Sequence, residues 1–140
     1  RSPDLPLTDP YQALILASIV EKETAAPAER PRIAGVFVRR LRRGMLLQTD
    51  PTVIYGLGEA FDGNLRRADL SHDHPYNTYL HAGLPPTPIA LPGAAALAAA
   101  VNPAPGDALY FVATGQGGHV FSRTLDEHNR AVRQYQLKGK

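Results

Sequence analysis

The stretch LILASIVEKET, residues 14–24, decides how this chain can fold. Asp9 can cap a helix that begins at Pro10, where the missing backbone N–H of proline costs nothing. Apolar side chains cover nearly the whole circumference of this helix. A helix that is apolar on all sides belongs in the interior of its domain. The sequence therefore predicts a central buried helix that ends in two glutamates, Glu21 and Glu23.

The two glutamates have different neighbours on the predicted helix. Glu21 falls on a strip with Leu14, Ala17 and Ser18, whereas Glu23 lies roughly opposite. A carboxylic acid among apolar groups has a raised pKa, which a general acid requires at neutral pH. The strip favours Glu21 as the candidate acid and leaves Glu23 as the alternative. The helical pattern leaves a third possibility open, in which both glutamates merely face water in the last turn.

The composition limits the class of protein. The 140 residues include 44% hydrophobic and 20% charged side chains, with a formal net charge of +2. These values predict one soluble globular domain with a substantial core. The absence of cysteine excludes disulfides, thiolate metal sites and cysteine nucleophiles. The small positive charge suits an anionic polymer without requiring one, and no apolar run is long enough to span a membrane.

Cap and turn signals divide the rest of the chain into short elements. In order, these are a helix at about 28–43, a short strand at 45–48, a short helix at 49–55, a long ordered loop at 71–92 with one central strand, an alanine-rich helix at 93–101, a hairpin with strands at 109–113 and 119–122, and a last helix that opens with a capping box at Thr124. The predicted fold class is α+β, with four to five helices packed around a small, mostly antiparallel sheet that includes a C-terminal hairpin, and with long ordered loops.

Several standard sites are not indicated. The glycines near residue 117 lie between two strands, so they do not form a phosphate-binding loop. His72 and His74 lie close together in a proline-bounded loop, which favours surface residues over metal ligands. The arginines at 39–43 suit a solvated helix end, because no aromatic residues interleave with them. We expect no metal, no cofactor and no nucleic acid partner.

With these sites set aside, the remaining candidate chemistry is acid catalysis by a carboxyl group on a sugar substrate. Glu21 and Glu23 point apart and cannot form a close pair on a helix. One carboxylate suffices if the nucleophile is a hydroxyl of the sugar itself, because the acid that protonates the leaving oxygen can then take the hydroxyl proton. Aromatic and polar side chains of two loops suit sugar faces and hydroxyls. The candidate substrate contacts are Gln48, Thr49, Asp50, Tyr55, Tyr76, Asn77, Thr78, Tyr79 and Glu23.

Five motifs, in order, resemble the YceG-like family of endolytic murein (lytic) transglycosylases. They are ASIVEKET at 17–24; AGVF at 34–37 with the RL and GM pairs that follow; LQTDPTVIYG at 47–56; YNTY at 76–79 with GLPP at 83–86; and LYFV at 109–112 with GGH at 117–119 and HN at 128–129. The resemblance covers the chain from Tyr11 to Tyr135. The resemblance is specific because all five motifs occur in the same order, whereas any one of them alone would be weak evidence for the family.

The resemblance implies cleavage inside peptidoglycan glycan strands, at the β-1,4 bond between N-acetylmuramic acid and N-acetylglucosamine. The bond is broken without water and leaves a 1,6-anhydromuramoyl end. The family's catalytic glutamate lies in the Glu-Lys-Glu string, and we carry it to Glu21, with Glu23 as the alternative. A different class of function is a non-catalytic glycan-binding or scaffold module of the cell-wall synthesis machinery.

Members of the family usually have an N-terminal membrane segment and a small LysM-like region before the catalytic part. We expect residues 1–140 to be the catalytic domain alone, with an extended lead-in at 1–8, a flexible tail at 138–140 and neither of those other parts. The expected location is the bacterial cell envelope, on the periplasmic side of the cytoplasmic membrane. The expected partners are glycan strands, cell-wall synthases, and division or elongation proteins; membrane contact would need a segment absent here.

Overall fold

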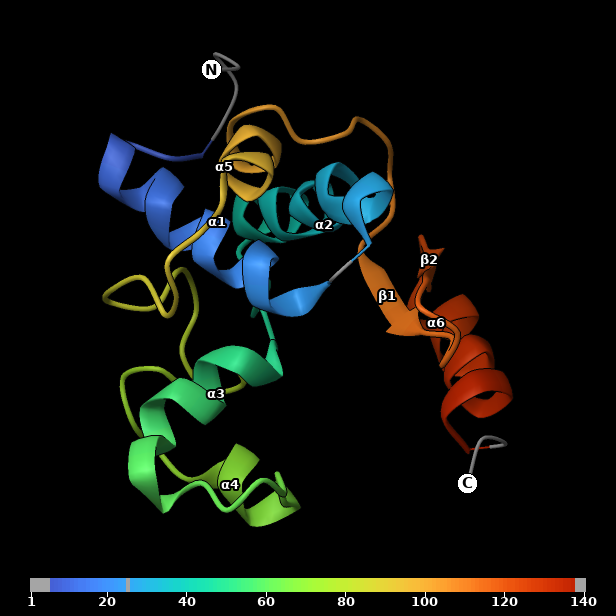
Figure 1. Ribbon diagram of the computed structural model, residues 1–140. Helices are drawn as coiled ribbons and strands as arrows, with labels where there is room; N and C mark the ends of the chain where they lie inside the picture. The colour runs from blue at the N-terminus through green and yellow to red at the C-terminus, as the bar shows by residue number, and fades with distance from the viewer. Residues whose placement is uncertain (1–5, 25, 138–140) are drawn as a thin grey trace.

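The computed structural model describes residues 6–24 and 26–137. This part of the chain forms six α-helices and one two-stranded antiparallel sheet, which confirms the α+β class (Figure 1). The helices are α1 (Pro10–Glu23), α2 (Arg30–Arg43), α3 (Asp50–Leu57), α4 (Arg67–Ser71), α5 (Ala94–Val101) and α6 (Leu125–Val132), and the strands are β1 (Tyr110–Ala113) and β2 (His119–Ser122). The 3₁₀ turns Pro27–Glu29 and Gly58–Ala60 and the π-helical turn Arg133–Leu137 complete the elements. The predicted tail and most of the predicted lead-in lie outside the described residues.

Helices α1, α2 and α5 pack together and form the core (Figure 1). Leu16, Ile19 and Val20 of α1 are fully buried, as the apolar pattern of this helix predicts. Asp9 is the N-cap and accepts a hydrogen bond from the backbone N–H of Gln12 at 2.9 Å. The central buried helix is therefore confirmed, and none of the described helices is long and apolar enough to cross a membrane.

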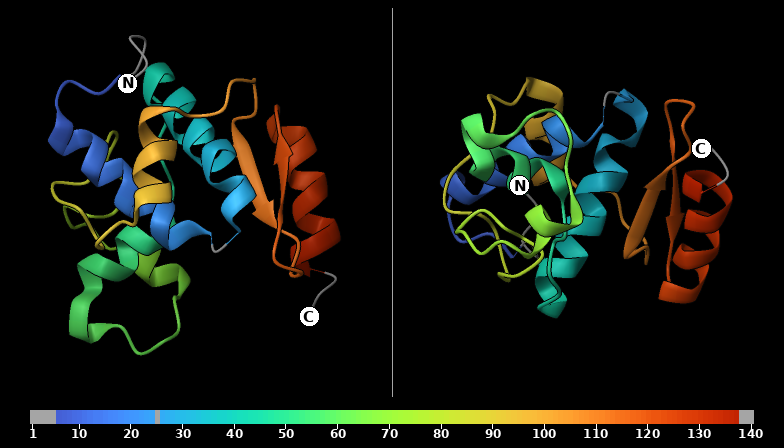
Figure 2. Two further views of the ribbon diagram at one scale, coloured as in Figure 1. Left: turned by 45° about the horizontal axis from the view of Figure 1, so that its top comes forward. Right: turned by 90° about the horizontal axis from the view of Figure 1, so that it is seen from below.

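The hairpin lies between α2 and α6 (Figure 2). Its register pairs Tyr110 with Ser122, and Phe111 packs edge-on against Phe37 of α2 with 5.7 Å between the ring centroids. Thr124 caps α6 in the predicted capping box. The C-terminal hairpin and last helix thus form a unit beside the helical body.

The predicted strand at 45–48 is wrong, because these residues have no regular secondary structure. Gln48 has a φ of 51°, which an extended strand does not allow, and its N–H makes one isolated bond to the carbonyl of Thr78 at 3.2 Å. The described loop at 71–92 holds no strand either. The short helix α4 was not predicted.

Candidate active site

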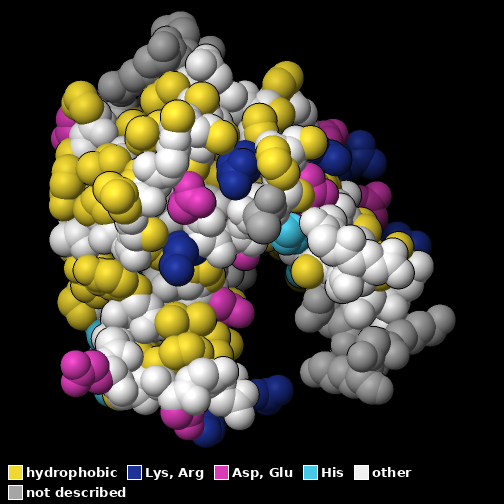
Figure 3. Space-filling view, viewed as in Figure 1, with side chains coloured by type: hydrophobic (Ala, Val, Ile, Leu, Met, Phe, Trp, Pro, Cys, Tyr) yellow, Lys and Arg dark blue, Asp and Glu magenta, His cyan; other side chains and the backbone are white. Residues whose placement is uncertain are grey.

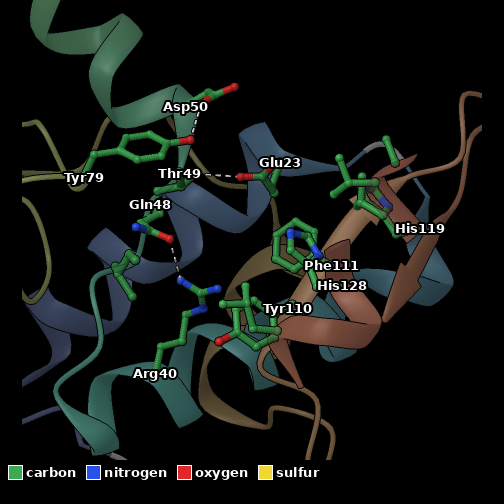
Figure 4. Close-up of a pocket in the computed structure, with 15 residues that line it drawn as sticks. Glu23, Arg40, Gln48, Thr49, Asp50, Tyr79, Tyr110, Phe111, His119 and His128 are labelled. Atoms are coloured by element: carbon green, nitrogen blue, oxygen red, sulfur yellow. Dashed lines mark hydrogen bonds between the residues drawn. The ribbon is translucent and has the colours of Figure 1, made fainter. Parts of the chain in front are cut away.

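A cleft of about 550 Å³ separates the helical body from the hairpin unit (Figure 3). The end of α1, residues 47–50 and Tyr79 line it from the helical body, and β1, β2 and α6 line it from the hairpin unit. Its polar and aromatic lining includes Glu23, Arg40, Gln48, Thr49, Asp50, Tyr79, Tyr110, Phe111, His119 and His128 (Figure 4). The cleft thus brings together side chains from seven separate parts of the chain, Arg40 of α2 among them.

Glu23 is the last residue of α1 and points into this cleft (Figure 4). The helix ends there because Thr24 takes an extended conformation. The Thr49 hydroxyl donates a hydrogen bond of 2.6 Å to Oε2 of Glu23. The buried helix therefore presents a carboxyl group at its end, and a neighbouring hydroxyl orients it.

The surroundings of Glu23 favour its protonated form. Burial raises the pKa of Glu23, and the negative charge of Asp50 raises it further. The hydrogen bond from Thr49 and the charge of His119 act in the opposite direction, but the net shift is upward. Glu23 thus has the environment of a general acid that keeps its proton closer to neutral pH than a free glutamate does.

Buried hydroxyl groups hold Thr49 in place. The N–H of Thr49 donates to Oγ1 of Thr78 at 3.0 Å, and the hydroxyl of Thr52 donates to the Thr49 carbonyl at 3.0 Å. All three threonines are buried. Thr78 was predicted to contact substrate, but in this structure it supports the residue that orients Glu23.

Asn77 organises the loop beside the cleft. Its side-chain N–H₂ donates to the carbonyls of Leu70 and His72, and its Oδ1 accepts from the N–H of Tyr79 at 2.9 Å. The Tyr79 hydroxyl donates to Oδ1 of Asp50, at the start of α3. Burial and then this bond raise the pKa of the Tyr79 phenol, so Tyr79 remains a neutral donor. Asn77 is thus buried and not part of the cleft lining, whereas Tyr79 and Asp50 line the cleft.

Glu21 lies outside the cleft lining. Its Oε1 accepts a hydrogen bond of 2.8 Å from the backbone N–H of Gly93, the N-cap residue of α5. Ser18, one turn earlier, accepts from the N–H of Ile89 at 3.0 Å. The strip that contains Glu21 therefore packs on the 89–93 segment, and Glu21 is not part of the cleft lining.

Two predicted contacts also lie away from the cleft lining. Tyr55 is about half exposed, at 47%, and its ring centroid lies 5.0 Å from that of Tyr76. The Tyr76 hydroxyl shares a hydrogen bond of 2.8 Å with the Thr87 hydroxyl. This pair connects α3 to the long loop, so of the predicted set the structure gathers only Glu23, Gln48, Thr49, Asp50 and Tyr79 around the cleft.

Several cleft residues were not predicted. The expected solvated helix end is wrong for Arg40, which is buried because its guanidinium donates to the carbonyls of Leu109 and Leu46 at 2.7 and 2.8 Å. It also lies 5.0 Å from the centre of the Tyr110 ring, which stacks on His128. Helical spacing alone could not show that these residues lie near Glu23. The GGH motif at 117–119 and the HN motif at 128–129 were sequence signals for the hairpin and α6 side of the cleft. Among the described residues, no three acidic or histidine side chains gather as a metal site.

The fold and the cleft define an α+β domain with one carboxyl group of raised pKa in an open polar groove. The chain belongs to the YceG-like family, whose sequence profile matches residues 1–134. This match confirms the resemblance drawn from the five motifs.

Two curated relatives carry the name endolytic murein transglycosylase. The Bacillus subtilis (strain 168) protein is 46% identical over 125 residues, which cover 89% of this chain and 34% of that protein. The Streptococcus pneumoniae serotype 2 protein is 37% identical over 130 residues, which cover 89% of this chain and 23% of that protein. The chain therefore spans about a third or less of the curated relatives it matches.

A solved structure shares the fold. The crystal structure of a YceG-like protein from Listeria monocytogenes superposes with a TM-score of 0.78 at 46% sequence identity. The match covers 86% of this chain and 38% of the Listeria chain.

Proposed function

We propose that this domain cleaves peptidoglycan glycan strands internally as a lytic transglycosylase, with Glu23 as the general acid. The names of its relatives support the reaction class. The single observation that supports the residue is the position of Glu23, which lies in the cleft with a raised pKa and a hydrogen bond from Thr49. Glu21 is the weaker candidate, because Gly93 engages its carboxylate outside the cleft.

In the minimal scheme, one carboxyl group carries out both proton transfers. Glu23 donates its proton to the oxygen that bridges the two sugars, and the bond from that oxygen to C1 of the muramoyl residue breaks. The C6 hydroxyl of the same sugar then attacks C1. The ionised Glu23 takes the hydroxyl proton, so a 1,6-anhydro ring forms and no water is consumed.

The other cleft residues have roles that suit a glycan. Asp50 and the Tyr79 hydroxyl form a polar pair on the wall beside Glu23, and Gln48 is exposed next to them. Tyr110 presents an aromatic ring of the kind that packs against sugars. The proposed substrate places the working protein outside the cytoplasm. The predictions of a periplasmic location and of cell-wall synthases as partners stand as predictions.

The chemistry of the new chain ends tests this proposal. Purified glycan strands are incubated with the domain, and the fragments are analysed by mass. We expect internal cuts and muramoyl ends that are lighter by one water than reducing ends. Reducing ends would make the domain a hydrolase, and strand binding without any cleavage would favour the glycan-binding module.

A further inference from the structure

His119 lies at the hairpin side of the cleft and is held by a carboxylate from a distant part of the chain. Its Nδ1 lies 2.8 Å from Oε1 of Glu29, and its backbone N–H donates to Oε2 of Glu29 at 2.9 Å. The two side chains are largely buried, with 10% and 17% of their surface exposed. One carboxylate therefore fixes both the backbone and the imidazole ring of His119.

This double contact determines which ring nitrogen carries the hydrogen. Burial opposes ionisation of Glu29, but the hydrogen bonds from His119 outweigh it and lower the pKa of Glu29. An ionised carboxylate only accepts, so Nδ1 is the donor, and Nε2 of a neutral ring is left with its lone pair. The hydrogen bonds that His119 makes to Glu29 use its backbone N–H and Nδ1, and Nε2 bonds to none of the described residues. The ring that lines the cleft is therefore prepared to accept a proton there.

His119 also lies in the same cleft as Glu23 and interacts with it electrostatically. The two residues line one cleft from different elements, β2 and α1, and the charge of His119 affects the pKa of Glu23 (Figure 4). The Phe111 ring packs edge-on against the imidazole with 5.4 Å between centroids, which limits its rotation. Arg32 acts on Glu29, and the other charged or titratable side chains in the described lining of the cleft are Arg40, Asp50, Tyr79, Tyr110 and His128.

We propose that His119 is the catalytic base that takes the proton of the attacking sugar hydroxyl, while Glu23 protonates the leaving oxygen. This inference rests on the proposed function and divides between two side chains the proton transfers that the minimal scheme assigns to one. Glu29 is a positioning residue, because it acts through the ring of His119. A histidine held by a buried carboxylate is an established way to orient a base.

The step balances without a further reactant. The C6 hydroxyl gives its proton to Nε2 of His119 as O6 forms its bond to C1. The C1–O4 bond breaks, its electron pair stays on O4, and O4 takes the proton of Glu23. The imidazolium of His119 then returns one proton to Glu23 through solvent in the open cleft, which restores both groups.

Two substitutions separate this role from a structural one. In Glu29→Gln, the amide oxygen can still accept from the backbone N–H of residue 119, but the amide N–H₂ donates to Nδ1 and moves the ring hydrogen to Nε2. In His119→Asn, a side-chain donor remains for Glu29, but the side chain has no basic nitrogen to take a proton in the cleft. We expect each variant to lower kcat about a hundredfold or more and to leave strand affinity within about threefold of the wild type.

The control is His81→Asn, which removes the histidine of an exposed pair with Asp73 outside the cleft and should leave kcat unchanged. Thermal unfolding checks that each variant is folded. The pH profile adds a readout that a structural role does not move: a fall in kcat at low pH, which a catalytic base imposes, should be present in the wild type and absent from His119→Asn. Nitrogen NMR of the wild-type imidazole should place the neutral ring's hydrogen on Nδ1.

Each result has a defined meaning. If folded Glu29→Gln and His119→Asn keep the wild-type kcat and its low-pH fall, His119 is not the base and the single-carboxylate scheme stands. A hydrogen on Nε2 in the neutral wild-type ring would also overturn the inference, whatever the variants do. If the wild type does not form anhydro ends, or if Glu23→Gln forms them at the wild-type rate, the proposed function itself fails.

Discussion

Glu21 and Glu23 stand two residues apart on one helix and lie in opposite environments. The carboxylate of Glu21 caps the backbone of Gly93 at the start of α5, whereas that of Glu23 lies in the cleft and bonds to Thr49. Each group accepts one hydrogen bond, and burial together with a nearby acidic group raises the pKa of Glu23 in the cleft. The difference shows that an apolar helical strip can mark a packing contact as well as a catalytic pocket.

Among changes to the neighbours of the two glutamates, the largest effect is expected from Thr49→Val. The change keeps the side-chain volume and removes the hydroxyl that bonds to Glu23, while the contacts from Thr49 to Thr78 and Thr52 use its backbone. Loss of a bond to the charged form raises the pKa of Glu23 further and leaves its carboxyl group less well oriented. We expect kcat to fall about tenfold and its high-pH limb to move upward.

Thr52→Val is the matched control for Thr49→Val. It removes another buried hydroxyl, one that bonds to Thr49 and Thr78 but not to Glu23. Its effect should be on stability, with the high-pH limb of kcat in place. Equal pH profiles for Thr49→Val and the wild type would mean that this hydroxyl does not tune Glu23.

A smaller effect is expected from Glu21→Ala. The change removes the carboxylate that accepts from the N-cap residue of α5, a kind of contact worth about 1 kcal/mol. The free energy of unfolding in urea should fall by about that amount, and the cleavage rate per folded molecule should not change. If Glu21→Ala is as stable as the wild type but cleaves far more slowly, Glu21 is the catalytic acid.

The smallest effect concerns the stability of the protein as a function of pH. Since folding raises the pKa of Glu23, its contribution to stability is present below the pKa of an unfolded glutamate and is lost as the pH rises through the folded value. Glu23→Gln removes this loss. The difference in unfolding free energy between variant and wild type should grow in favour of the variant from acidic to neutral pH. A difference that stays constant with pH would show that Glu23 titrates as a free glutamate.

Local signals in the sequence were sufficient for most of the fold. Asp9 and Pro10 mark the start of α1, α2 ends at Arg43, and Thr124 opens α6, as predicted. These signals work because caps and turns depend on a few neighbouring residues. Residues 45–48 were misread because their conformation depends on a contact between Gln48 and Thr78, which lie thirty positions apart in the sequence.

The site could be predicted only in part. Helical spacing separated Glu21 from Glu23 and favoured Glu21, whereas Glu23 is the one that lines the cleft. The spacing could not show this, because the other wall of the cleft comes from the hairpin, about ninety residues later. The same limit hid His119, because its carboxylate partner Glu29 lies ninety positions earlier in the chain. Side chains that are so far apart in the sequence share no helical or strand periodicity that would reveal their contact.

The comparison of Glu21→Gln with Glu23→Gln tests the central claim most directly. Both changes keep side-chain size and remove one titratable group, and both variants are assayed on the same glycan strands by counting anhydro ends. We predict that Glu23→Gln loses about 10²- to 10⁴-fold in initial rate and that Glu21→Gln cleaves at the wild-type rate. The reverse result, with Glu23→Gln active and Glu21→Gln inactive although folded, would contradict the assignment of the acid to the cleft.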